Sequence, residues 1–182
     1  EVVCASGESD YFKRLSDMGA RPVGVPFARH SIGFFSNFLL LIRLFLLVKA
    51  ERPDVVHSFT HKPAIFGSIA AWLAGVRNTH VTITGLGNVF VHDDWKTKVV
   101  RRLLLIQYKI AMKCVDTVFF QNPDDKELFV RGKVVPDSKA VLTAGSGLDL
   151  SEFPAPSDAE VTAARARLGS ELGVDLISRR VV

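Results

Sequence analysis

The chain has 182 residues, of which 48% are hydrophobic, and a formal net charge of +4. This length and apolar content suffice for one ordinary domain with a buried core, followed by a tail. The charge is too small to argue by itself for nucleic acid, and we expect no nucleic-acid partner. Two cysteines, Cys4 and Cys114, are too few and too unpatterned for a disulfide framework or a zinc site, which suits a reducing cytoplasm.

The amino-terminal segment predicts a strand, a helix and a second strand. Apolar runs predict strands at 1–5 and 22–26, and the residues between them predict a helix at 9–18. The chain begins on a strand without a methionine, and residues 181–182 are typical of another strand. We therefore expect both ends to be cut and an earlier strand of the first domain to be lacking.

Residues 34–48 form the most apolar segment and predict a helix. The run 38–48 contains one charged residue, Arg43. It is too short to span a bilayer, which needs about 20 residues. Two interpretations stay open: a helix buried on most sides, or a helix that contacts a membrane interface.

Residues 53–90 predict a strand, a helix and a second strand. The helix is expected at 64–74 and the second strand at 80–84. Thr60 is placed to cap the helix, and Pro63 falls near its first turn, where its missing N–H costs nothing. Two parallel strands need such a crossover helix, so the segment predicts a βαβ unit.

Residues that suit substrate binding follow the two strands of this unit. Ligands of open α/β sheets bind at the carboxyl ends of the strands. The residues that we expect at those ends, in contact with substrate, are His57, Thr60, Lys62, Thr84, Gly85 and Gly87. His57 equally suits the orientation of a hydroxyl group and an ordinary structural role. Lys62 equally suits a phosphate partner and a solvated side chain.

Residues 95–114 predict a second long helix. At about 100° per residue, one face carries five basic residues and the adjacent face carries four apolar ones. The basic residues are Lys98, Arg101, Arg102, Lys109 and Lys113, and the apolar ones are Val99, Leu103, Ile106 and Ile110. This arrangement predicts that the five basic residues contact an anionic membrane surface. The alternative is a solvated face over an ordinary core stripe.

The next segment predicts a strand at 115–121, a helix capped by Asn122, and a strand at 140–143 that leads to Gly145 and Gly147. We expect Asn122 and the two glycines to contact substrate. The alternative for the glycines is a tight turn without a ligand.

The remainder of the chain predicts a linker and the start of a second domain. A proline-rich linker at 154–156 precedes a charged helix at 158–172. We therefore predict one domain at 1–153 and the truncated start of another at 154–182.

Three motifs, in this order, resemble the amino-terminal half of a family-four glycosyltransferase. They are segments 53–90, 119–125 and 145–149, and the resemblance covers residues 1–155. It is nearest to the branch that builds bacterial surface polysaccharides. It implies a Rossmann-like parallel α/β sheet with helices on both faces, as the acceptor-side half of a two-domain B-type fold.

The resemblance also implies an activity. A hexose or N-acetylhexosamine would pass from a nucleotide-sugar donor to a lipid-linked glycan acceptor in surface polysaccharide synthesis. The protein would be cytoplasmic and peripheral on the inner face of the plasma membrane. The family's donor-binding residues lie in a carboxyl-terminal domain, so we expect this chain alone to be inactive. No metal and no organic cofactor is implied.

Two other kinds of site are not expected. Segment 85–87 lacks the third glycine of a dinucleotide fingerprint, because Phe90 stands in its place. His57 and His61 straddle a strand end and a helix start, which is unsuitable spacing for zinc. Many members of the family carry a histidine near the position of Thr84, so the catalytic base is left unassigned.

Two further hypotheses remain. A nucleotide-sugar 2-epimerase uses a similar two-domain architecture, but it needs several catalytic carboxylates, which the strand ends here do not offer. A non-catalytic acceptor-binding module is the other, and the linker and the unfinished strand argue against it.

Overall fold

The structure is a computed structural model that describes residues 1–7, 9–26, 33–87, 94–147 and 154–175. The chain forms two compact units, Glu1–Gly145 and Ser146–Val182. The end of the resembling segment, at 148–149, and the strand expected at 181–182 lie outside the described residues.

The first unit opens with a strand–helix–strand segment, as predicted. Strand β1 (Val2–Ser6) pairs in parallel with β2 (Ala20–Gly24), and α1 (Tyr11–Asp17) connects them. Arg21 of β2 forms ion pairs with Glu1 and with Glu51 at the end of the next helix. These contacts tie the small sheet to the helix that follows it.

Helix α2 (Phe34–Glu51) ends three residues later than predicted, where Arg52 adopts a left-handed conformation with φ 48°. Among the α2 side chains that the structure describes, only Leu40 and Leu44, one turn apart, are buried, and they pack with Val25 and Ala70. The prediction of a helix buried on most sides was wrong, because a single stripe of α2 packs on the domain. Its exposed apolar side chains are Phe35, Phe38, Leu39, Ile42 and Leu46.

The main sheet has four parallel strands in the order β3-β4-β5-β6. The strands are β3 (Val55–Phe59), β4 (Asn78–Ile83), β5 (Thr117–Phe120) and β6 (Ala140–Leu142). The connections are η1 (Pro63–Gly67) with α3 (Ser68–Ala74), α4 (Trp95–Ala111) with η3 (Met112–Cys114), and α5 (Pro123–Arg131) with η4 (Asp137–Lys139). The predicted βαβ unit is confirmed by β3, α3 and β4.

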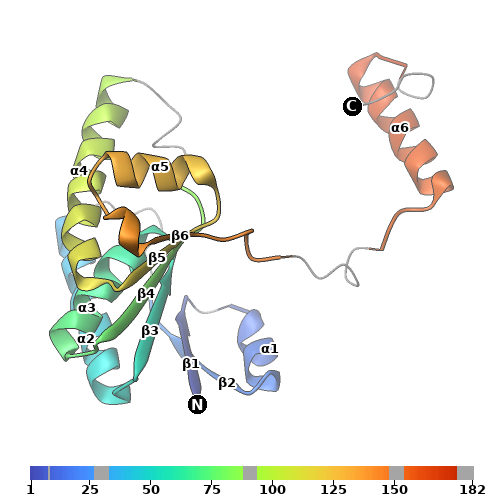
Figure 1. Cartoon of the computed structure of the whole chain (residues 1–182). Helices are drawn as coiled ribbons and strands as arrows, with labels where there is room; N and C mark the ends of the chain where they lie inside the picture. Colours follow the sequence, from blue (N-terminus) through green and yellow to red (C-terminus); the bar gives the residue numbers. More distant parts are fainter. Residues whose placement is uncertain (8, 27–32, 88–93, 148–153, 176–182) are drawn as a thin grey trace. The chain divides into compact units, whose positions relative to one another are not determined.

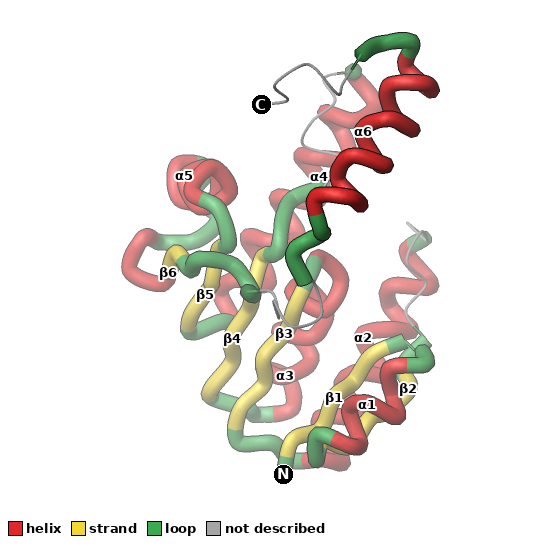
Figure 2. The backbone as a smooth tube through the Cα atoms, turned by 90° about the vertical axis from the view of Figure 1, so that its right-hand side faces the viewer, coloured by secondary structure: helices red, strands yellow, loops and turns green. Residues whose placement is uncertain are grey.

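The crossover helices all cover the same face of this sheet (Figure 1). Successive right-handed crossovers that advance in one direction must place their helices on one side. The core therefore forms between that face and the helices, where Val81, Val118 and Phe120 meet Tyr108 and Phe129. Helix α1 lies on β1 and β2 from the side opposite to the crossover helices (Figure 2). The unit therefore carries helices on both faces, as predicted.

The parallel strands are divided between two sheets. Strands β1 and β3 are not hydrogen-bonded to each other, and within the described residues no strand lies between them. The two sheets are joined by α2, which packs on α3 and on η1.

The second unit contains α6 (Asp158–Leu172), at the predicted bounds. Ser157 and Glu160 form a reciprocal capping box at its start, and Gly173 ends it with φ 65°. In the described part of the chain, no helix is both long and apolar enough to cross a bilayer.

The π-helical turn η1 packs closely on strand β3. A Cβ atom at Gly67 would lie 2.7 Å from Oγ of the buried Ser58 but 3.7 Å from its Cβ. We therefore expect Gly67→Ala to lower the free energy of unfolding by about 1–3 kcal/mol through overpacking. Urea denaturation measures this change, and adding Ser58→Ala should restore most of the loss. Equal loss with and without Ser58→Ala would contradict the steric explanation.

Candidate functional site

The carboxyl ends of β3, β4 and β5 lie at one edge of the sheet, and the loops that follow them carry most of the predicted binding residues. The backbone N–H of Thr60, just after β3, donates to the carbonyl of Thr82 in β4 at 3.2 Å. This bond holds the start of the loop after β3 against strand β4.

Thr60 adopts a left-handed conformation with φ 67°. This region is costly for a β-branched residue, and such strain collects at functional positions. The prediction that Thr60 caps the helix through its side chain was wrong. A capping residue is extended, whereas Thr60 is left-handed, and it contributes its backbone carbonyl, which accepts from the Ala64 N–H at 3.0 Å.

His61 is held between α4 and the glycine loop. Its Nδ1 lies 2.5 Å from the hydroxyl of the buried Tyr108, and its ring also hydrogen bonds to the backbone of Leu86. The Leu86 bond favours protonated His61, so the backbone carbonyl accepts from the ring. The ring's other nitrogen then accepts from the Tyr108 hydroxyl. The histidine is therefore fixed in orientation and tautomer.

Burial sets the protonation of this pair. It lowers the pKa of His61, while the Leu86 backbone and Asp125 act in the opposite direction. It strongly raises the pKa of Tyr108, and Asp125 adds to that effect, so the phenol stays a donor at neutral pH. Edge-on packing of Tyr108 against Phe129, with ring centroids 5.0 Å apart, anchors the phenol in the core.

Asn122 supports the same edge from β5. Its side-chain oxygen accepts from the Asp125 N–H at 2.8 Å, which confirms the predicted cap of α5. Its amide nitrogen donates to the Asp125 carboxylate at 2.7 Å. We call His61, Leu86, Tyr108, Asn122 and Asp125 the carboxyl-edge cluster.

The loop after β4 contains two glycines in conformations that favour glycine: φ is 149° at Gly85 and 69° at Gly87. A Cβ at Gly87 would lie 3.6 Å from Nε2 of His61, so this glycine lies beside the cluster. Thr84 is exposed and Lys62 is half-buried, and burial lowers the pKa of the Lys62 ammonium group.

The prediction that His57 lies at the end of its strand was wrong. Strand β3 continues for two more residues, so His57 is in mid-strand on the sheet face opposite the crossover helices. Its Nε2 lies 2.8 Å from Oγ1 of Thr82, and its ring stacks on Phe59 at 4.4 Å. Burial and the neighbouring His80 lower the pKa of His57. The structure thus separates His57 from the carboxyl-edge cluster.

Gly145 and Gly147 follow β6, with φ 92° and 75°. Both residues are therefore left-handed, and among the described residues no atom of another segment lies within 4 Å of where a Cβ would stand at either position. Contact of the two glycines with substrate stays a prediction. Gly145 closes the first unit, and Gly147 belongs to the second.

The basic residues of α4 lie on its outer side, beside an apolar stripe that is also exposed. Arg101 is half-buried and the other four are exposed. The stripe of Val99, Leu103, Ile106 and Ile110 is 50–56% exposed. The alternative that these four residues form a core stripe was wrong, because Tyr108, Ala111 and Met112 supply the buried side.

His61 and Tyr108 were not among the predicted site residues. The sequence signal for Tyr108 is a lone phenol on the inward face of an amphipathic helix, since a buried hydroxyl needs a partner. The signal for His61 is its place two residues after a strand end and two residues before Pro63. Among the described residues, no group of three or more His, Cys, Asp or Glu side chains is arranged to hold a metal ion.

A family model described as a glycosyl transferase 4-like domain matches residues 1–145. The chain belongs to this family. The matched residues include both sheets and the whole carboxyl-edge cluster, and the resemblance inferred from the three motifs is confirmed.

Two curated relatives transfer sugars to undecaprenol-linked acceptors. The N,N'-diacetylbacillosaminyl-diphospho-undecaprenol alpha-1,3-N-acetylgalactosaminyltransferase of Campylobacter jejuni is 26% identical over 84% of this chain and 40% of its own length. The UDP-Gal:alpha-D-GlcNAc-diphosphoundecaprenol alpha-1,3-galactosyltransferase of Escherichia coli is 31% identical over 75% of this chain and 34% of its own length. The chain thus spans well under half of either relative.

Solved structures share the fold. A glycosyltransferase from Rickettsia africae superposes with a TM-score of 0.57 at 14% identity, over 98% of this chain and 42% of that one. Anabaena HepE, solved with UDP and glucose, superposes with a TM-score of 0.55 at 12% identity, over 92% of this chain and 42% of that one. The predicted α/β fold of half a B-type glycosyltransferase is confirmed.

The hydroxyl of Tyr108 can be tested alone. We expect Tyr108→Phe to lower the free energy of unfolding by about 1–3 kcal/mol, because it leaves Nδ1 of His61 without its donor. Tyr11→Phe is the matched control, since the chain's other tyrosine is exposed on α1. Chemical denaturation measures both, and equal stability of the two variants would contradict the hydrogen bond.

The two lowered histidine pKa values predict acid sensitivity. Below the usual histidine pKa of 6.5, the unfolded histidines bind protons more readily than His57 and His61 in the folded protein. The free energy of unfolding is therefore fully retained above that pH and falls as the pH decreases through the lowered values. Denaturation measured from neutral to mildly acidic pH should show this fall, with a smaller slope in His61→Gln. An unchanged slope in this variant would remove His61 as a cause.

Proposed function

We propose that the full-length protein transfers a hexose or N-acetylhexosamine from a nucleotide-sugar to a polyprenyl-diphosphate-linked glycan in surface polysaccharide synthesis. The observation that carries this proposal is that both curated relatives are named for transfer to undecaprenol-linked acceptors. The UDP in the HepE structure supports a nucleotide-sugar donor.

The carboxyl-edge cluster is our candidate for the acceptor side of the site. Transfer needs a positioned acceptor hydroxyl and donors that stabilise the leaving diphosphate. The glycine loop at 85–87 lies at this edge with Gly87 beside His61, and its backbone N–H groups are our candidates for such donors. His61, fixed by Tyr108 and Leu86, provides a neutral polar group beside it. Thr60, Lys62, Thr84 and Asn122 complete the proposed site.

We further propose that the protein lies peripherally on the cytoplasmic face of the plasma membrane, where a polyprenyl-linked acceptor is held. The apolar stripe of α4 is exposed beside basic side chains, as in helices that lie in a membrane interface. Exposed apolar residues of α2, and Trp72 and Leu73 of α3, add apolar surface on the helical side of the sheet. Such clustered exposure marks an interaction surface.

The activity is tested with the full-length protein, UDP-sugars and a polyprenyl-diphosphate-linked glycan. UDP release should require the acceptor, and His61→Gln should lower kcat/KM by roughly tenfold or more, as expected for a group positioned at the reacting centre. His57→Gln discriminates the two histidines. A loss at His57 rather than His61 would move the site to the opposite sheet face, and no UDP release with any donor would reject the proposal.

Membrane docking is tested by sedimentation with phosphatidylglycerol vesicles at low salt. Reversing Lys98 and Arg102 to glutamate should release the protein, since each charge near an anionic surface contributes about 1 kcal/mol. Reversal of Lys13 and Arg77, which are exposed outside α4, is the matched control. Binding that ignores both lipid charge and the α4 variant would reject electrostatic docking.

A further inference from the structure

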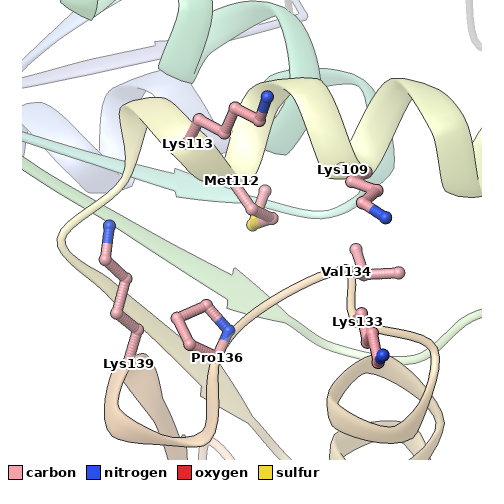
Figure 3. A pocket seen from close by; sticks show the side chains of 7 residues that line it. All are labelled: Lys109, Met112, Lys113, Lys133, Val134, Pro136 and Lys139. Carbon is pink, nitrogen blue, oxygen red and sulfur yellow. The ribbon is translucent and has the colours of Figure 1, made fainter.

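A pocket of about 380 Å³ lies where α4 ends and where the connections into β5 and β6 begin. Four lysines line it, namely Lys109, Lys113, Lys133 and Lys139, around an apolar floor that includes Met112 and Val134. Figure 3 shows the lysine side chains distributed around the two buried apolar residues. The pocket is at the amino-terminal edge of β5 and β6, whereas the carboxyl-edge cluster lies at the other end of the strands.

Within the described residues, the four lysines of this pocket have no carboxylate paired with them. The nearby acids are engaged elsewhere: Asp137 pairs with Lys126 at 3.1 Å, and Asp116 accepts from the Thr79 N–H at 2.8 Å. Lys139 donates to the Val115 carbonyl at 2.6 Å, which fixes its position but not its charge.

The partial negative charges at helix ends compensate only part of this positive charge. The carboxyl ends of α4 and α5 both lie near the pocket, and lysines are favourable there. Each helix end, however, carries only about half an elementary negative charge. Two such ends leave most of the positive charge of four lysines uncompensated, so the pocket suits an anion.

Lys133 stands where its side chain is unexpected. It is the second residue after α5, following Gly132 at the end of that helix, and it adopts a left-handed conformation with φ 51°. Glycine or asparagine is favoured at such a position, and a residue with a longer side chain is strained there. The presence of lysine in this unfavourable conformation supports a role for its charge in binding an anion.

We propose that this pocket binds the headgroup phosphate of an anionic phospholipid. The inference rests on the membrane docking proposed above and gives it a discrete lipid site. Lys109 and Lys113 belong to the same helix and its 3-10 extension as the exposed Ile106 and Ile110. A phosphate among the lysines is thus adjacent to apolar surface that suits the acyl chains. A freely soluble anion has no acyl chains that could contact that surface.

The experiment uses the full-length protein and dihexanoyl phosphatidylglycerol kept below its micelle concentration, with binding measured by calorimetry. Without a bilayer there is no diffuse surface potential, so only a discrete site gives saturable binding. The pocket pair, Lys109→Gln with Lys133→Asn, should lose roughly tenfold or more in affinity, because each substitution removes a charge-assisted contact with the phosphate. Asparagine tolerates the left-handed backbone. Lys98→Gln with Arg102→Gln removes equal charge from α4 outside the pocket and should bind like the wild type.

Each outcome decides between sources of the phosphate. Equal losses in the two pairs would overturn the pocket and leave diffuse charge as the cause, with vesicle docking intact. Inorganic phosphate bound as tightly as the lipid would overturn a lipid site in favour of a soluble anion. Absence of both short-chain lipid and vesicle binding would overturn the pocket and the docking proposal together. If the pocket pair misfolds by circular dichroism, Lys109→Gln alone, at an exposed position, serves in its place.

Discussion

The architecture depends on one constraint, the handedness of the crossovers between parallel strands. Strands β3 to β6 follow one another across the sheet in a single direction, so right-handed crossovers bring their helices to one face. That face holds the core. The same parallel order gathers every carboxyl end at one edge. The candidate site therefore occupies an edge of the sheet, and the helices that build the core also provide the outer surface of the domain.

Helix α4 connects the site with that outer surface. Its inward side carries Tyr108, which holds His61 at the carboxyl edge. Because the helix is amphipathic around a buried phenol, its opposite side presents the stripe that includes Leu103 and Ile106 to solvent. The rotation of one helix thus fixes both the histidine at the proposed acceptor site and the apolar surface proposed to lie on the membrane. The lysine pocket at the end of the same helix extends this arrangement.

Several sequence interpretations failed for the same physical reason: periodicity shows that a face is apolar but does not show what covers it. The stripe of α4 that one of the two interpretations placed in the core is exposed, because another face, with Tyr108 and Met112, is the buried one. His57 was placed at a strand end because the polar residues around it resemble a boundary, yet the parallel ladder continues to Phe59. Its side chain consequently lies on the face that the crossovers leave uncovered.

The sequence by itself determined the order and type of the elements, the cap at Asn122, the glycine loop and the family. These features rest on local chemistry: β-branched runs, capping side chains and glycines whose positive φ no other residue adopts easily. Only the tertiary structure decided that His61, rather than His57, meets the glycine loop, and that Thr60 is left-handed. These facts depend on strand register and helix rotation. Both are set by long-range packing, which local sequence chemistry does not specify.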